Sequence, residues 1–181
     1  MKPHETNETD AIAAACRGDV DALAGLFERH YATMVWVAYA VLLDRSLAED
    51  AAQQAFATAC AKLRSLRQLD RFGPWLATIC RNAAQDIARA RRRDVALQKA
   101  AVVEEPAQGG SDGFDRAVKD AVDGLPSMYR EVVVLHYYSG MSYSQIESVL
   151  NISGDRVKGR LARARRRIQV RLEKEGFRRE Q

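Results

Sequence analysis

The sequence has few of the residues on which catalytic and metal sites depend. It contains three histidines and three cysteines among 181 residues, and neither type recurs at the spacing of metal ligands. No glycine-rich loop of the phosphate-binding kind is present, and no cysteine has a histidine paired with it in the sequence. We therefore expect no metal site, no cofactor and no catalysis by this chain alone.

Long apolar runs are also absent. No stretch approaches the roughly 18 apolar residues that a membrane-spanning helix needs, and the opening MKPHETNETD does not have the form of a signal peptide. Cys16, Cys60 and Cys80 lie in apolar helical context, where we expect reduced core thiols. These features predict a cytoplasmic protein without membrane insertion, with a short disordered N-terminus over residues 1–9.

Charge is distributed unevenly along the chain. The formal net charge is +4, but the segments differ strongly: −5 over 1–60, +7 over 61–93, −4 over 94–123, −1 over 124–153 and +7 over 154–181. Each basic block lies on a predicted helix that also carries an apolar stripe. Two such blocks favour contacts with one polyanion, such as nucleic acid, over two merely solvated helix faces.

Nearly every segment has helical periodicity, so the fold class is predicted to be all-α with no strand. Thr9 or Asp10 is expected to cap the first helix, and Asp19 the second. Ser46, followed three residues later by Glu49, has the spacing of a capping box and is expected to open the third helix.

A stretch rich in proline, glycine, serine and acidic residues, VEEPAQGGSDG, interrupts the helical pattern and predicts a linker. We therefore expect two small helical domains joined by a flexible acidic linker. The predicted ranges are 10–94 for the first domain, 95–113 for the linker, 114–176 for the second domain and 177–181 for a tail.

The second domain ends in the pattern of a helix-turn-helix. Ser142 with Gln145 forms a second capping box, and Asn151 suits a tight left-handed turn. Ser153 is expected to cap the basic helix that follows. That helix keeps an apolar stripe at steps of three and four residues, made of Val157, Leu161, Ala164, Ile168 and Leu172.

The basic helix carries groups that can read DNA. In a helix-turn-helix the first turns of the second helix enter the major groove. Arginine can bond guanine bidentately there, and aspartate can accept from the amino group of cytosine. Arginines farther along are expected to hold phosphates, whatever the base sequence. An amphipathic helix that pairs with a partner helix is the alternative, but it leaves the turn and the cap unexplained.

These motifs resemble the extracytoplasmic-function (ECF) sigma factors of bacterial RNA polymerase. The segment LPSMYREVVVLHYYSGMSYSQIESVLNISGDRVKGRLARARRRI is similar to their DNA-binding region four. In the first half, AEDAAQQAFATACAKL is similar to the polymerase-binding helix of region two, and WLATICRNAAQDIARARRR to its helix for the downstream promoter element. The resemblance covers residues 19–172. It implies a protein that binds RNA polymerase core, recognises promoter DNA and promotes strand opening for transcription initiation.

The resemblance also implies three sets of site residues. The polymerase-binding set would dock on the clamp helices of the largest subunit as an acidic, amide-rich patch beside an exposed aromatic ring: Glu49, Asp50, Gln53, Gln54 and Phe56. The set for the downstream element and for melting is Arg67, Arg71, Trp75, Arg81, Asn82, Asp86, Arg89 and Arg92. The set for the upstream element is Ser153, Asp155, Arg156, Lys158, Gly159, Arg160, Arg163 and Arg167.

Simpler structural explanations exist for some of these residues. Glu49 and Asp50 also suit the first turn of a helix, where negative charge favours the helix dipole. Phe72 or Trp75 could stack on a base, but Trp75 is more readily a core anchor. Asp86 is expected to orient Arg89 or Asn82, or to accept from a base amino group, instead of facing DNA alone. The resemblance favours the DNA-binding and polymerase-binding roles for these sets as a whole.

The resemblance implies further partners, and other functions compete with it. Its partners would include the polymerase flap and an anti-sigma factor. A stand-alone dimeric helix-turn-helix regulator explains the second half equally well, and a helical adaptor for acidic proteins is a third possibility. Two residues depart from the family pattern: Glu147 replaces a small alanine, which is expected to alter the packing against the basic helix, and Asn151 replaces a turn glycine.

Overall fold

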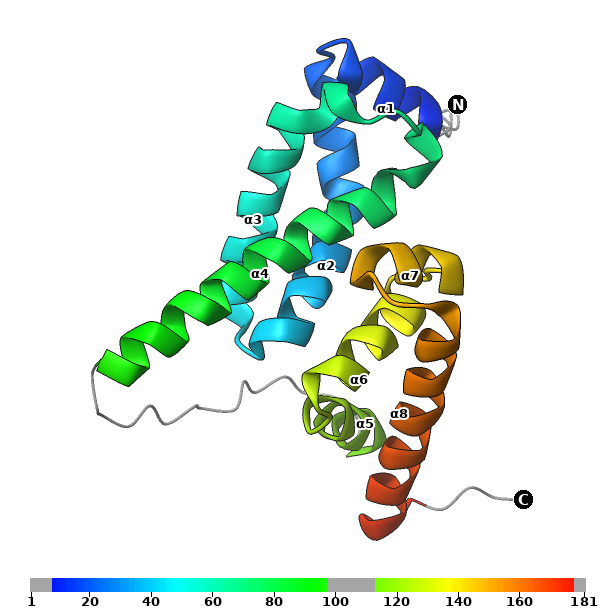
Figure 1. Cartoon of the computed structure of the whole chain (residues 1–181). Helices are drawn as coiled ribbons and strands as arrows, with labels where there is room; N and C mark the ends of the chain where they lie inside the picture. The colour runs from blue at the N-terminus through cyan, green and yellow to red at the C-terminus, as the bar shows by residue number, and fades with distance from the viewer. Residues whose placement is uncertain (1–7, 98–112, 178–181) are drawn as a thin grey trace.

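The computed structural model describes residues 8–97 and 113–177, and within these ranges it contains helices and turns but no strand. This confirms the all-α prediction. The chain folds into two helical units, shown at the upper left and lower right of Figure 1. The first contains α1 (Glu8–Cys16), α2 (Val20–Leu42), α3 (Arg45–Lys62) and α4 (Phe72–Leu97); the second contains α5 (Gly113–Asp123), α6 (Ser127–Val133), α7 (Tyr143–Leu150) and α8 (Gly154–Lys174).

The first unit is built on three mutually packed helices, α2, α3 and α4, with α1 laid against α2. The buried face of α3 is lined by small side chains, at Ala48, Ala51, Ala52, Ala55 and Ala59. Small residues at a contact let two helix axes approach closely, because the side chains at the contact set the interaxial distance. The larger side chains of the core come from the neighbouring helices, where Leu26, Met34 and Leu76 are fully buried.

The first two helices begin close to the expected positions. α2 has Asp19 as its N-cap, and the Asp19 carboxylate accepts a hydrogen bond from the N–H of Ala22 at 3.0 Å, as predicted. α1 already begins at Glu8, so Thr9 and Asp10 lie inside its first turn instead of capping it. The helix thus includes the last two positions of the N-terminus that we expected to be disordered; residues 1–7 lie outside the described residues.

The third helix has a different cap from the predicted one. α3 begins at Arg45, and its N-cap is Asp44, whose side chain accepts from the N–H of Leu47 at 3.1 Å. The prediction of Ser46 was wrong because Asp44 lies two residues earlier and is an equally good capping residue. The chain leaves α2 through Leu43 in the left-handed conformation (φ 53°), which places Asp44 at the start of the next helix.

The region between the two units is only partly described. α4 runs to Leu97, three residues into the predicted linker 95–113, and α5 starts at Gly113, its last position. The remaining part, 98–112, and the chain end at 178–181 lie outside the described residues. Among the helices of 8–97 and 113–177, none is both long enough and apolar enough to cross a membrane.

The second unit contains the expected helix-turn-helix. Ser142 and Gln145 form the predicted capping box at the start of α7. Asn151 adopts the left-handed conformation at φ 52° and ψ 53°, which asparagine tolerates better than most residues. α6 leads into a short π-helical segment, Val134–Tyr138 (η3), and Gly140 (φ 63°) then reverses the chain toward α7.

The three cysteines do not share one environment. Cys80 is fully buried, and its thiol donates to the carbonyl of Met34 at 3.2 Å. Burial raises the pKa of the Cys80 thiol to about 12, so this group stays protonated at neutral pH. Cys16 is half-buried, but Cys60 is exposed near the end of α3. The prediction of a core position for Cys60 was wrong because its neighbour Ala59 takes the buried face of the helix.

Candidate nucleic-acid interface

Helix α8 has one buried face, and the rest of its surface is strongly basic. Val157, Leu161 and Ala164 are fully buried, and they hold the helix against α5, α6 and α7. Ser153 occupies the N-cap position as predicted, although its side chain makes no capping hydrogen bond. The apolar stripe therefore fixes which side of α8 faces away from the protein.

The predicted upstream-element residues lie on the accessible faces of α8. Ser153, Asp155, Arg156, Lys158, Arg163 and Arg167 are exposed, and Gly159 and Arg160 are half-buried. Within the described part of the chain, none of the basic residues in this set forms an ion pair. The guanidinium of Arg167 lies over the ring of Tyr129, 5.3 Å from its centroid, so part of its length packs on the protein. The other cations keep their charge available for an anionic partner.

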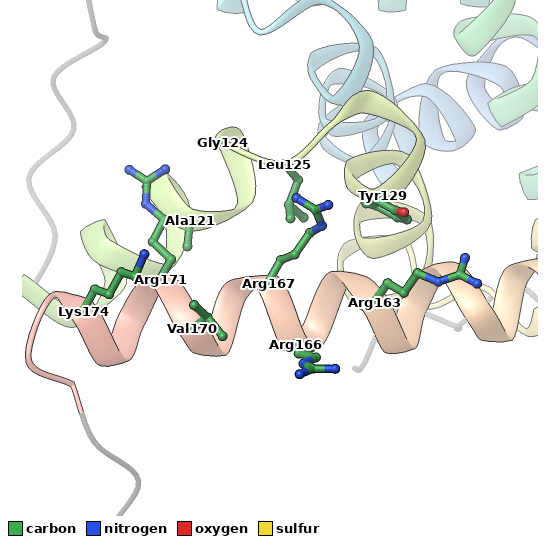
Figure 2. Close-up of a pocket in the computed structure, with 10 residues that line it drawn as sticks. All are labelled: Ala121, Gly124, Leu125, Tyr129, Arg163, Arg166, Arg167, Val170, Arg171 and Lys174. Carbon is green, nitrogen blue, oxygen red and sulfur yellow. The ribbon is translucent and has the colours of Figure 1, made fainter.

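The second half of α8 lines a basic groove that the sequence reasoning did not identify. The groove has a volume of about 570 Å³ and lies between α8 and the turn from α5 to α6. Figure 2 shows Arg167 and Arg171 pointing from α8 toward this turn, whereas Arg166 points away from it. The basic residues that line the groove are Arg163, Arg166, Arg167, Arg171 and Lys174. Positive charge thus extends along α8 well beyond the turns expected to contact bases.

Glu147 is accommodated by a glycine on the helix that it faces. A Cβ at Gly154 would lie 2.8 Å from the Glu147 Oε1 atom, so the absence of a side chain at Gly154 makes room for the Glu147 carboxylate.

Helix α4 presents a second polar face, made of Asn82, Asp86, Arg89 and Arg92, all of which are exposed. The Asp86 carboxylate accepts from the guanidinium of Arg89, one turn farther along the helix, which is the contact expected if Asp86 orients Arg89. Arg91 instead pairs with Asp44 of the α3 cap at 3.3 Å. At the basic end of α4, Arg91 therefore makes a structural contact, whereas Arg89 and Arg92 lie on the accessible face.

Arg81 does not share this accessible face. Its guanidinium donates to the carboxylate of Glu131 on α6, and both side chains are largely buried. Arg81 is therefore engaged by the second unit of the same chain, although the sequence placed it with the DNA-binding residues.

The segment between α3 and α4 exposes Arg67 and Arg71 but not the aromatic rings of the sequence that follows. Phe72 is buried in the core, which rules it out as a base-stacking ring in this arrangement. Trp75 is half-buried, packs against the core and lies 5.9 Å from Phe72 between ring centroids. The structure thus favours the anchoring explanation for Trp75.

The predicted polymerase-binding residues lie on α3, with one correction. Asp50, Gln53 and Gln54 are exposed, and Glu49 pairs with Arg45 at 2.7 Å. Phe56, however, is buried, because its ring packs against α2.

The exposed aromatic ring beside this patch comes from α2 instead. Phe27 is 37% exposed, and its ring centroid lies 4.4 Å from that of Phe56 and 5.1 Å from that of Tyr31. The sequence pattern counted Phe27 as part of the apolar face of its helix, and only the packing against Phe56 shows that it lies at the edge of that face.

An apolar groove on the second unit is another surface that sequence reasoning missed. Three aromatic side chains, Phe114, Tyr137 and Tyr138, are exposed around a groove of about 570 Å³ between α5, η3 and α8. A signal was present in the sequence, since Tyr137 and Tyr138 follow an apolar run, and the structure places both rings at the exposed end of η3. Exposed aromatic residues at a groove are typical of protein-binding surfaces.

Comparison with known proteins identifies both units. The family model for Sigma-70 region 2 matches residues 26–94, and the model for Sigma-70, region 4 matches residues 115–168.

Curated relatives are similar over most of this chain. The probable RNA polymerase sigma factor RfaY of Xanthomonas campestris pv. campestris is 33% identical over 153 residues, which are 77% of this chain and 38% of RfaY. The RNA polymerase sigma factor CarQ of Myxococcus xanthus is 31% identical over 75% of this chain and 80% of its own length. The ECF RNA polymerase sigma factor SigW of Bacillus subtilis is 28% identical over 86% of this chain and 91% of its own.

Two solved structures share the fold. CnrH, in complex with the cytosolic domain of CnrY, matches with a TM-score of 0.68 and 26% identity over 92% of this chain and 97% of that chain. RpoE from Bartonella quintana, in complex with the anti-sigma factor NepR, matches with a TM-score of 0.70 and 28% identity over 83% of this chain and 96% of that chain.

Proposed function

The chain belongs to the extracytoplasmic-function group of sigma-70 factors, and on this premise we propose how its two helical units divide the work of transcription initiation. As a sigma factor it binds RNA polymerase core and promoter DNA, and the polymerase supplies the chemistry. Its place of action is the cytoplasm, where RNA polymerase works. The observation that carries the proposal is the presence of two separate accessible faces, on α4 and on α8, that combine arginines with base-reading polar groups.

In this proposal the first unit docks on the polymerase through the exposed patch of α3 and the ring of Phe27, and holds the downstream element through α4. The second unit reads the upstream element as duplex through the first turns of α8, and the basic second half of α8 grips phosphates. An anti-sigma protein and the polymerase flap are its further protein partners, and the apolar groove beside Tyr137 is the surface that we assign to the flap.

A stand-alone dimeric regulator is not favoured. It would use the helix-turn-helix alone and would leave the accessible faces of α3 and α4 without a role, whereas both units match sigma-factor models. The two functions differ in their need for polymerase. Run-off transcription with core polymerase on a promoter library should give initiation from a specific subset of promoters that depends on this chain. Tight sequence-selective binding by the pure chain, with no effect on initiation, would reject the proposal.

Replacing Asp50 with asparagine is expected to weaken binding to RNA polymerase core by about tenfold, roughly 1.4 kcal/mol, because it removes the charge that would pair with basic groups of the partner while keeping the size of the side chain. Asp50 is exposed and forms no ion pair within the described residues, so its charge is available to a basic partner. The measurement is the affinity of the labelled chain for core. The matched control is Asp115→Asn, which removes one exposed carboxylate from α5. Equal affinities for both variants would contradict a docking role for Asp50.

Replacing Arg160 or Arg167 with alanine is expected to separate base reading from phosphate binding. Arg160→Ala should change which bases are preferred in the upstream element, with losses of about 1–3 kcal/mol at the affected position. Arg167→Ala should weaken all promoters alike and lower the slope of log K against log salt by about one. Both are measured on holoenzyme with a set of single-base promoter variants at several salt concentrations. A uniform loss for both variants would remove the base-reading role of Arg160.

A further inference from the structure

Helix α1 lies beside the segment that connects α3 to α4 (Figure 1). It contacts both 3₁₀ turns of this segment, η1 (Leu63–Ser65) and η2 (Leu69–Arg71), as well as α2. The helix lies outside residues 26–94, the range that the region 2 model matches, so the family match assigns it no role. The buried side chains by which α1 packs are Ala11, Ile12 and Ala15.

The connecting segment, residues 63–71, divides its side chains between the core and the surface with a period of three. The apolar residues at this spacing are Leu63, Leu66, Leu69 and Phe72, and each is buried in the core or packed against it. A period of three is that of the 3₁₀-helix, in which side chains at i and i+3 lie on the same side, and both ends of the segment are 3₁₀ turns. The side chains between the apolar ones consequently face outward, and they include the exposed arginines Arg64, Arg67 and Arg71.

The start of this segment is joined to the last residue of α1. The thiol of Cys16 is half-buried and donates to the carbonyl of Leu63 at 3.7 Å. A thiol is a weak donor, so the contact contributes little energy by itself. Ile12, one turn earlier in α1, is fully buried and keeps this end of the helix in place. α1 thus fixes the point at which the chain leaves α3.

The other end of the segment is held through a histidine of α2. The carboxylate of Glu8, the first residue of α1, accepts a hydrogen bond from Nε2 of His30 at 2.6 Å. The His30 ring meets the ring of Phe72 edge-on, with 5.2 Å between the centroids. A Cβ at Gly73 would lie 4.0 Å from Cε1 of His30, so the same ring also lies against the first turn of α4. Glu8 therefore orients the ring against which the segment ends.

We propose that α1 is a positioning element for strand capture, which holds both ends of residues 63–71 and so presents Arg64, Arg67 and Arg71 to the single-stranded downstream element in one arrangement. The proposal rests on the function proposed above, in which the first unit holds this element. Unstacking a base costs a few kcal/mol, and a cationic segment that is already ordered loses less conformational entropy when the strand binds. Glu8 and His30 are thus positioning residues, because they act through the segment.

The test compares Glu8→Ala with Asp10→Ala in the full chain bound to polymerase core. Both substitutions remove one carboxylate from the first turn of α1, so their effects on net charge and on the helix dipole are matched. The probe is a single-stranded oligonucleotide with the downstream element of a promoter that the run-off assay selects. Glu8→Ala should weaken binding of this probe by about fivefold relative to Asp10→Ala, which is within the range for the loss of one hydrogen bond.

Two further measurements separate positioning of the segment from support of the whole unit. The affinity for core and the binding of duplex upstream element should be equal for the two variants, because neither depends on residues 63–71. Glu8→Gln keeps an oxygen that can accept from His30, and it should restore most of the binding of the single-stranded probe. Cys16→Ala acts at the other end of the segment and should weaken probe binding in smaller measure, since it removes a weaker contact.

Equal affinity of Glu8→Ala and Asp10→Ala for the probe would overturn the proposal. A parallel loss of affinity for core in Glu8→Ala would overturn it as well, because α1 would then support the whole unit. Failure of the unmodified holoenzyme to bind the single-stranded probe would instead reject the function on which the proposal rests, so the two failures are distinguishable.

Discussion

Replacing Arg130 with alanine is expected to lower the free energy of unfolding by about 3 kcal/mol, because a buried polar group that loses its hydrogen-bond partner costs roughly 1–3 kcal/mol. The substitution leaves the carbonyls of Ala40, Asp123 and Leu125 without the donors that now satisfy them. Burial lowers the pKa of the Arg130 guanidinium, and the nearby Asp123 and Glu131 oppose that shift. The protein therefore bears a desolvation cost at this position that these partners offset only in part.

The measurement is urea unfolding followed by circular dichroism, with Arg116→Ala as the control. Arg116 is an exposed arginine on α5 with no ion pair among the described residues, so its replacement should change stability by less than about 0.5 kcal/mol. A loss at Arg130 as small as the loss at Arg116 would show that the three carbonyls find other donors, and it would remove Arg130 as the centre of the contact between the units.

Replacing Leu161 with alanine is expected to destabilise the second unit by about 2–5 kcal/mol, the usual cost of such a substitution in a packed core. Leu161 is fully buried on the face of α8 that packs against the other helices of this unit. Because this stripe sets the orientation of α8, the same change should abolish specific recognition of the upstream element. Binding to polymerase core through the first unit should persist.

The control for this substitution is Val170→Ala on the same helix. Val170 is 44% exposed, so losing its two methyl groups removes little buried area and should cost less than about 0.5 kcal/mol. Thermal unfolding of both variants would measure the loss of stability, and footprinting of their holoenzymes would measure recognition of the upstream element. Upstream protection that survives in Leu161→Ala would mean that the orientation of α8 does not depend on its apolar stripe.

The parts of the fold that depend on neighbouring residues were predictable. The capping box of Ser142 and Gln145, the left-handed Asn151 and the apolar stripe of α8 involve interactions within one or two turns of chain, which the sequence contains in full. The cap of α3 was predicted two residues late because Asp44 and Ser46 are both acceptable capping residues. Local chemistry could not decide between them; the left-handed end of α2 at Leu43 did.

The candidate sites also divide into residues that the sequence could identify and residues that only packing could place. Asn82, Asp86, Arg89 and the first turns of α8 were named because the sequence resembles the family's DNA-binding helices, and the structure shows them on helix faces turned away from the core. Phe56 was misplaced because an aromatic residue beside a polar patch can point to either side of its helix. Packing against Phe27 and Tyr31 settled the question, and no spacing in the sequence records that contact.

The sequence by itself determined two all-helical units, a helix-turn-helix in the second and a basic surface on each, because helical periodicity, caps and charge are properties of contiguous residues. Only the tertiary structure decided that Arg81 pairs with Glu131 and that Arg130 donates to the carbonyl of Ala40. It also decided that the start of α7 faces Arg71. These contacts join residues far apart in the chain, and which of many compatible charges and donors meet depends on how the helices pack.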